Sequence, residues 1–231
     1  MSESILEVFK ADGWRLGDCA IIPYDRKRVD IWGTNYLHYL YGKCLESRPS
    51  SPWGVLPDLM CGFADLSSDA VCSYLAGKPI AILCVHTSPT EFTPAGFCWP
   101  TEQIRSPAAN SAFCAFVVFR PFWGTPESTV LGMLGISYLF TTYGLRTIMG
   151  QRVSSNVLAG KWMEKYGATD VGVVPDLLRT HKGGLESCTL SVLHRADFEN
   201  YCRHEILKLA RGGIQDGQKE DNRSPRSSPI Q

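Results

Sequence analysis

The sequence has no surplus of charge of either sign, because 23 Lys and Arg side chains stand against 23 Asp and Glu, for a formal net charge of zero. Binding to nucleic acid or to an anionic membrane surface draws on a surplus of Lys and Arg. The balance therefore argues against a nucleic-acid-binding protein, and we expect no nucleic acid among its partners.

Long apolar runs are also lacking. The most apolar stretch, Val130 to Leu145, is shorter than the roughly 20 residues that a membrane-spanning helix needs, and it contains three glycines. The first 14 residues carry Glu3, Glu7, Lys10 and Asp12 and have no apolar core, unlike a secretory signal. We therefore expect a cytoplasmic protein that does not enter a membrane.

Metal-binding spacings are absent as well. The nine cysteines include no Cys-x-x-Cys pair, and the five histidines never lie three to five residues apart, although structural zinc sites use such spacings. Nine is an odd number, and the chain is not a small one, so a complete disulfide framework is not indicated either. We expect no metal, and cysteines that are reduced and packed as small hydrophobic side chains.

The apolar pattern predicts a mixed α/β fold of the α+β class, because strands come first and then alternate with helices. An antiparallel meander with a hairpin turn at Gly77-Lys78 is expected from strands at 70–76, 79–86, 92–99 and 112–119. The elements expected after it are helices at 128–143, 156–166 and 197–209 and strands at 146–153 and 185–194.

Three segments follow from this division. Residues 70–210 are expected to form the core of the domain. Residues 1–69 are expected to add the first strand and helices of the same domain, including a helix over 26–41 with Asp25 as its N-cap. Residues 211–231 are almost entirely polar residues, Gly and Pro, so we expect a disordered tail.

Two helix starts carry residues suited to binding a ligand. The free backbone N–H groups and the positive dipole end of a helix can hold a diphosphate, and Ser128 and Thr129 add hydroxyl donors beside the Gly124 turn. An ordinary strand-to-helix connection gives the same pattern. Asn156 stands before the next helix, either as a ligand-binding amide or as a simple N-cap.

Three motifs lie between residues 112 and 168. The first is a strand, FCAFVVF at 113–119, that leads through a glycine-containing turn into a long helix. The second is a helix-to-strand junction, YLFTTYGLRTI at 138–148. The third is the most specific, with NVLA at 156–159 followed by EKYGA at 164–168. Together they resemble the GNAT superfamily of acyl-CoA-dependent N-acetyltransferases, most nearly its ribosomal-protein N-acetyltransferase branch.

This resemblance implies a GNAT-like fold, in which helices cover both faces of a central, mostly antiparallel twisted sheet. It also implies an enzyme that transfers an acetyl group from acetyl-CoA to the primary amine of a protein N-terminus, a lysine or a small molecule. Whether the enzyme is a monomer or a homodimer stays open. The residues that the resemblance places beside acetyl-CoA are Val118, Phe119, Gly124, Thr125, Ser128, Thr129 and Asn156. A backbone N–H near Phe119 would be the oxyanion donor.

The chain departs from the family at the group that reprotonates the CoA thiolate. Met163 and Ala159 stand where relatives have Tyr and Ser, and neither can donate a proton. Tyr166 is the substitute that we consider, and His86 is a candidate base. Pro126 has no N–H and removes one phosphate donor from the turn. A catalytically inactive GNAT-fold protein that serves in interaction or assembly is therefore the alternative.

A thiol nucleophile is a further alternative near His86. Cys84 and His86 lie on one face of the expected strand, which would place a thiol beside its base. No acidic residue stands nearby to orient the imidazole, so packing in the core is the favoured interpretation. Glu102 is the other candidate base.

Overall fold

The computed structural model describes residues 5–25, 27, 35–46, 67–88, 91–105, 110–179 and 184–220. Within these residues, the strands form a single sheet in the order β1-β2-β3-β4-β5-β6-β8-β7. They are β1 (Arg15–Leu16), β2 (Cys19–Pro23), β3 (Ala81–Ser88), β4 (Glu91–Arg105), β5 (Asn110–Val118), β6 (Thr147–Val153), β7 (Thr169–Arg179) and β8 (Leu185–His194). Every neighbouring pair is antiparallel except β5 and β6, which are parallel.

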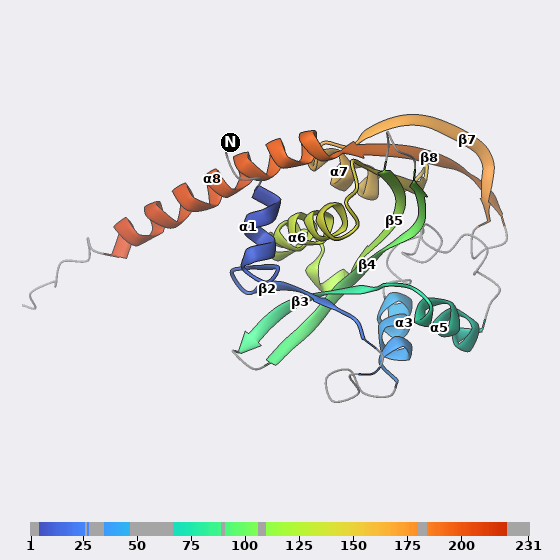
Figure 1. Ribbon diagram of the computed structural model, residues 1–231, viewed down its shortest axis with the longest axis horizontal. Helices are drawn as coiled ribbons and strands as arrows, with labels where there is room; N and C mark the ends of the chain where they lie inside the picture. Colours follow the sequence, from blue (N-terminus) through green and yellow to red (C-terminus); the bar gives the residue numbers. More distant parts are fainter. Residues whose placement is uncertain are drawn as a thin grey trace, which may run out of the picture.

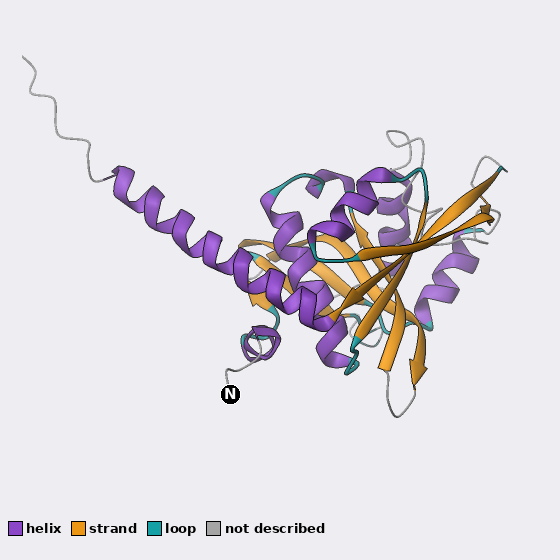
Figure 2. Cartoon of the chain, turned by 90° about the horizontal axis from the view of Figure 1, so that it is seen from above, coloured by secondary structure: helices purple, strands orange, loops and turns teal. Residues whose placement is uncertain are grey.

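Helices cover both faces of this sheet. They are α1 (Ile5–Ala11), α3 (Tyr36–Glu46), α5 (Ser68–Ala76), the short 3-10 helix η2 (Arg120–Phe122), α6 (Pro126–Thr142), α7 (Val157–Lys165) and α8 (Arg195–Glu220). Figure 1 shows α3 and α5 together on one side and α1, α6 and α7 on the other, and Figure 2 shows the two helical layers from above. The mixed α/β fold with a mostly antiparallel sheet and helices on both faces is thereby confirmed.

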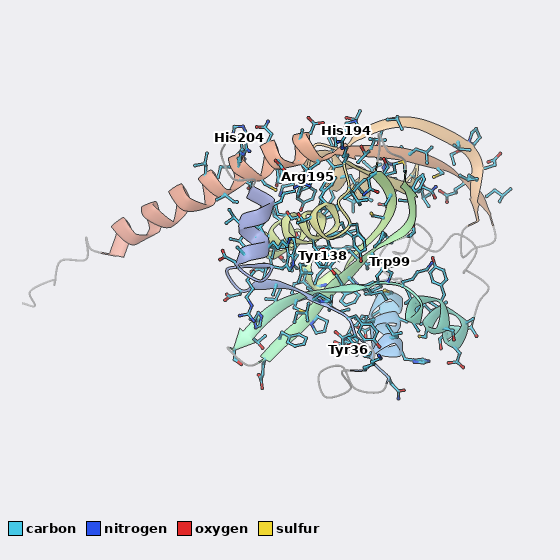
Figure 3. All side chains as sticks on the ribbon, in the orientation of Figure 1. Tyr36, Trp99, Tyr138, His194, Arg195 and His204 are labelled. Atoms are coloured by element: carbon cyan, nitrogen blue, oxygen red, sulfur yellow. The ribbon has the colours of Figure 1, made fainter. Side chains whose placement is uncertain are left out.

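Two hydrophobic clusters lie on the two faces of the sheet. Along β5, Ala112 faces the cluster under α1, α6 and α8, whereas Ala115 and Val117 face the cluster under α3 and α5, as the alternation of a strand requires. Figure 3 labels one large aromatic side chain from each cluster, Tyr138 and Trp99. Because both faces of the central strands are buried, these strands are apolar along most of their length.

Most elements expected in residues 79–209 are confirmed. The expected strands correspond to β3, β4, β5, β6 and β8, and the expected helices correspond to α6, α7 and the first half of α8. The edge strand β7 was not expected, because its residues show no clear alternation and its apolar side chains are largely exposed.

The strand expected at 70–76 is wrong, because these residues lie in helix α5. Ser67 caps this helix by accepting the Ala70 N–H on its side chain at 3.3 Å. Val71, Cys72 and Leu75 are the buried residues, a spacing that suits one helix face. A short apolar run does not distinguish strand from helix by itself. The antiparallel meander exists, but β2 takes the place of this segment, and Gly77 ends a helix instead of turning a hairpin.

The N-terminal helix also differs from the expectation over 26–41. Helix α3 begins at Tyr36 and continues to Glu46, and residues 26 and 28–34 lie outside the described part of the chain. The Asp25 carboxylate accepts the Lys27 N–H at 2.9 Å, which is a local turn. Strands β1 and β2 form one edge of the sheet, and α3 packs on α5.

At the C-terminal end, α8 continues past residue 211 to Glu220. The first residues of the expected disordered tail therefore have helical backbone, although they include Gly212, Gly213 and Gly217. Residues 221–231, the rest of that tail, lie outside the described residues. Within the described part of the chain, no helix has the length and apolar character needed to cross a bilayer.

Helices α6 and α7 approach each other closely at Gly132. A Cβ at this position would overlap the Tyr166 hydroxyl and would lie 2.9 Å from Trp162 Cζ2. We expect Gly132→Ala to lower the free energy of unfolding by about 1–3 kcal/mol, as overpacking does. Urea denaturation followed by circular dichroism measures this change.

Gly42→Ala is the matched control, because nothing lies within 4 Å of a Cβ at Gly42 in α3. This variant should gain about 0.5–1 kcal/mol, since alanine favours a helix interior over glycine. Equal stability of the two variants would contradict the close contact at Gly132.

Candidate active site

The sheet forks between β5 and β6. These strands pair over three residues only, Ser111–Phe113 with Thr147–Met149. Beyond that point β5 follows β4 to Val118, and β6 follows β8 to Val153. Each strand keeps its own antiparallel partner, and the twist of the sheet turns the two pairs apart.

A cavity of about 350 Å³ lies at this fork. Residues of β5, β6 and β8 line it from the sheet, and residues of α6 and α7 line it from the helical layer. Its polar lining residues are Ser128, Gln151, Arg152, Asn156 and Ser191, and the rest of the lining is apolar or glycine. This size and composition are typical of a small-molecule site.

The turn into α6 forms one end of the cavity. Gly124 has a φ of +74°, in the left-handed region that glycine adopts without strain. Thr125 is the N-cap of α6, and Pro126 is its first residue, where a missing N–H costs the helix nothing. Gly124 and Ser128 both line the cavity.

The start of α6, where the sequence predicts a cradle for phosphate, is partly satisfied within the helix itself. Pro126 has no N–H, and the Ser128 N–H donates to Thr125 Oγ1 at 3.4 Å. The pKa of the Glu127 carboxyl lies below its ordinary value, chiefly because of its own backbone N–H. An anion that binds here would therefore meet the Glu127 carboxylate beside the same helix start.

The end of β5 presents a backbone donor to the fork at Val118, the residue next to Phe119. The Phe119 N–H bonds to the Ala95 carbonyl of β4 at 2.7 Å, and the Phe119 side chain packs on the opposite face of the sheet. Successive N–H groups of a strand point to opposite sides, so the Val118 N–H points into the fork. Trp123 Nε1 donates to the Val118 carbonyl at 2.7 Å and covers this end of the cavity.

Asn156 is both a helix cap and a cavity residue. Its Oδ1 accepts the Ala159 N–H at 3.2 Å at the start of α7, and the residue lines the cavity. The N-cap interpretation is confirmed, and the ligand-binding interpretation stays a prediction that this position at the cavity permits. Ala159 and Met163 line the same cavity, so its α7 wall has no proton donor at these positions.

Four of the seven residues expected beside acetyl-CoA line the cavity: Val118, Gly124, Ser128 and Asn156. Phe119 does not, because it faces the other core. Thr125 is occupied as the N-cap, and its hydroxyl also donates to the Phe122 carbonyl at 3.0 Å. Thr129 Oγ1 accepts from Lys165 Nζ at 2.7 Å, which places a cation beside the first turn of α6.

The structure does not bring Tyr166 to the cavity. This side chain is fully buried, and its hydroxyl donates to the Ser128 and Thr129 carbonyls at 3.4 and 3.3 Å. Burial raises the pKa of Tyr166 well above its ordinary value. With its ring edge-on to Trp162, it ties the end of α7 to the start of α6, which is a packing position.

His86 also lies away from the cavity, on β3, which β4 separates from the fork. Its ring packs edge-on against Phe92, and its Nε2 is buried without a hydrogen-bond partner in the described structure. Burial raises the pKa of Cys84 to about 12, so this thiol is neutral and the thiol–imidazole alternative is not supported. Nothing is described of the Glu102 side chain.

Arg152 is the charged cavity residue that sequence analysis missed. Its Nη2 lies 2.6 Å from Asp170 Oδ2, and the other oxygen of Asp170 accepts the Ser191 hydroxyl at 2.6 Å. Gly160 of α7 leaves room for the Arg152 side chain, because a Cβ at position 160 would lie 2.9 Å from the guanidinium carbon. These partners come from separate elements, so no local motif signals them.

No group of His, Cys, Asp and Glu that could hold a metal ion occurs among the residues described. The cysteines in that part of the chain are free thiols. The cavity lining offers hydroxyl, amide and guanidinium side chains, the Cys114 thiol and the backbone at the fork.

No protein-family model matches this sequence, and no curated protein matches it either. Solved structures do match its fold. Ribosomal-protein-S5-alanine acetyltransferase from Vibrio fischeri has a TM-score of 0.59 and 12% identity, covering 80% of this chain and 97% of that one. RimJ from Mycobacterium smegmatis, in complex with CoA-disulfide, has a TM-score of 0.58 and 16% identity, covering 84% and 90%.

Spermidine N-acetyltransferase from Vibrio cholerae, in complex with CoA and spermine, is a third such structure. Its TM-score is 0.55 at 12% identity, covering 78% of this chain and 98% of that one. The fold that the three sequence motifs imply is thereby confirmed.

The capping role of Asn156 can be tested by two substitutions. We expect Asn156→Ala to lower the free energy of unfolding by about 1 kcal/mol, because the Ala159 N–H loses its cap. Asn156→Asp keeps a capping oxygen and should stay close to the parent protein. Thermal and urea unfolding measure both variants, and an unchanged stability of Asn156→Ala would contradict the cap.

Proposed function

We propose that this chain, which has the fold of the GNAT-family acetyltransferases, is an N-acyltransferase that moves the acyl group of an acyl-CoA, such as acetyl-CoA, to a primary amine. The observation that carries the proposal is the cavity at the fork of β5 and β6, beside the N-terminus of α6 and Asn156. Two similar folds were solved with CoA or its disulfide, which supports a CoA thioester as the donor.

The residues around the fork suit the parts of such a donor. The diphosphate belongs at the turn from Gly124 to Ser128, with Lys165 adding positive charge beside Thr129. The pantetheine arm belongs in the cavity, where Asn156 and the unpaired edge of β5 offer partners to its amides.

The thioester carbonyl belongs beside the Val118 N–H, which points into the fork. A backbone N–H fixed at this place stabilises the oxyanion that forms during acyl transfer. Among the backbone N–H groups near Phe119, this is the one that faces the fork, because the Phe119 N–H is already bonded to β4.

The reaction is a direct transfer. The lone pair of the neutral amine attacks the thioester carbonyl carbon, a C–N bond forms, and the C–S bond breaks with its electron pair leaving on sulfur. The proton lost by nitrogen passes through solvent to the thiolate, so the balance needs no side-chain acid at Met163 or Ala159. Catalysis then depends on positioning and on the oxyanion donor.

Calorimetric titration with CoA and acetyl-CoA tests the proposal, followed by thiol-release assays with peptide N-termini, lysine and polyamines. We expect binding that Ala159→Trp weakens at least tenfold, because the indole fills the cavity between α7 and β6. Lys161→Trp, on the exposed side of the same helix, is the matched control. Absence of heat and of thermal shift at millimolar acetyl-CoA would instead support the inactive interaction protein.

The Glu127 carboxylate beside the start of α6 leads to a second test. Glu127→Gln removes the carboxylate that competes with the diphosphate, and one unit charge at about 4 Å is equivalent to about 1 kcal/mol in water. We therefore expect roughly fivefold tighter CoA binding in titration calorimetry. Asp69→Asn removes the same charge from the first turn of α5, on the other face of the sheet, and should change nothing. If the parent protein, Glu127→Gln and Asp69→Asn all bind CoA with equal affinity, the diphosphate does not bind beside Glu127.

A further inference from the structure

The cavity at the fork has two ends of different chemistry. Near the start of α6 it is lined by polar groups, including Ser128, Arg152 and Asn156. Its other end lies between the later turns of α6 and the sheet, and is lined by Cys114, Ile136, Leu139, Ile148 and Leu193. From Ser128 to Leu139 the cavity follows about 16 Å of α6, at 1.5 Å for each residue.

The apolar end lies at the vertex of the fork. Ile148 pairs with Ala112 where the two strands are still joined, and Cys114 directly follows the last paired residue of β5. The end of α6 is held at this same level, because Asn110 Nδ2 donates to the Tyr143 and Gly144 carbonyls at 2.8 and 2.9 Å. The vertex closes the cavity at this end.

The vertex end has no ionised side chain. Ile136, Leu139, Ile148 and Leu193 are at most 4% exposed. Burial raises the pKa of Cys114 to about 12, so its thiol is neutral. A void lined in this way has no partners for water, so it stays dry and takes up apolar groups.

We propose that this vertex end is the binding site for an acyl chain longer than acetyl, so that the donor is a short- to medium-chain acyl-CoA. This inference rests on the proposed function. With the thioester beside the Val118 N–H, the chain runs along β5 toward Phe116 and Cys114, which lie on the same, cavity-facing side of the strand. Of an acyl-CoA, the hydrocarbon chain is the part whose chemistry matches this lining.

Titration calorimetry with CoA, acetyl-CoA, butanoyl-CoA and hexanoyl-CoA tests the inference. Each methylene that leaves water for an apolar site tightens binding by up to about fourfold. We expect hexanoyl-CoA to bind at least tenfold tighter than acetyl-CoA, with butanoyl-CoA between them. Acyl transfer to an amine should follow the same order in kcat/KM.

Variants at the vertex show whether the chain lies there. Cys114→Met fills part of the space and should cost hexanoyl-CoA at least fivefold in affinity while leaving acetyl-CoA within twofold. Ile148→Val enlarges the space slightly and should shift the preference toward octanoyl-CoA. Cys72→Met places the same change at a buried thiol on the other face of the sheet and is the matched control. Circular dichroism checks that each variant is folded.

The outcomes separate this inference from the proposed function. Acetyl-CoA binding as tightly as hexanoyl-CoA would overturn the acyl-chain site and leave the acyltransferase intact. A hexanoyl preference that neither Cys114→Met nor Ile148→Val alters would also overturn it, since the chain would then bind elsewhere. No binding of any CoA compound would overturn the proposed function itself.

Discussion

The parting of β5 and β6 is the constraint on which the site depends. A parallel pair is somewhat less stable per residue than an antiparallel one, and here it is interrupted after three residues while both strands keep their antiparallel partners. The interruption leaves backbone donors and acceptors at the fork without a neighbouring strand. Buried groups of this kind need partners. The Trp123 indole supplies one by bonding to the Val118 carbonyl, and a ligand with amide groups suits the remainder.

Close packing of α6 keeps this fork covered. Gly135 lets α6 lie against Phe116 of β5, where a Cβ would approach the ring to 2.6 Å, and Gly132 does the same against α7. Tyr166 then bonds to carbonyls in the first turn of α6 and sets the distance between the two helices. The cavity walls are therefore rigid elements of the core, which suits the proposed acyl transfer, because that reaction depends on holding the thioester in one geometry.

The two ends of the cavity differ in how they would affect a bound ligand. At the start of α6, Glu127 and Thr125 satisfy the helix terminus in the free protein, and this stabilises the fold while opposing an incoming anion. At the vertex, apolar side chains leave a space that water does not stabilise. For the proposed acyl-CoA donor, affinity would depend on how far burial at the apolar end offsets repulsion by Glu127 at the polar end.

The sequence by itself determined the elements whose signals are local. The Gly124 turn, the capped helix at Asn156 and the central strands are set by backbone conformation, capping and apolar pattern, all of which act within a few residues. The GNAT resemblance likewise rested on short motifs, and it named four residues that line the cavity. The same local signals misassigned residues 70–76, because a short apolar run fits a strand or a helix until its neighbours decide which face is buried.

Only the tertiary structure decided what depends on contacts between distant segments. The choice of Val118 over Phe119 at the fork follows from the register of β5 with β4. Arg152 enters the cavity because α7 supplies a glycine and β7 an aspartate, and Tyr166 leaves it because α7 turns that side chain under α6. These placements depend on register and packing between elements, which the order of residues along a single chain does not display.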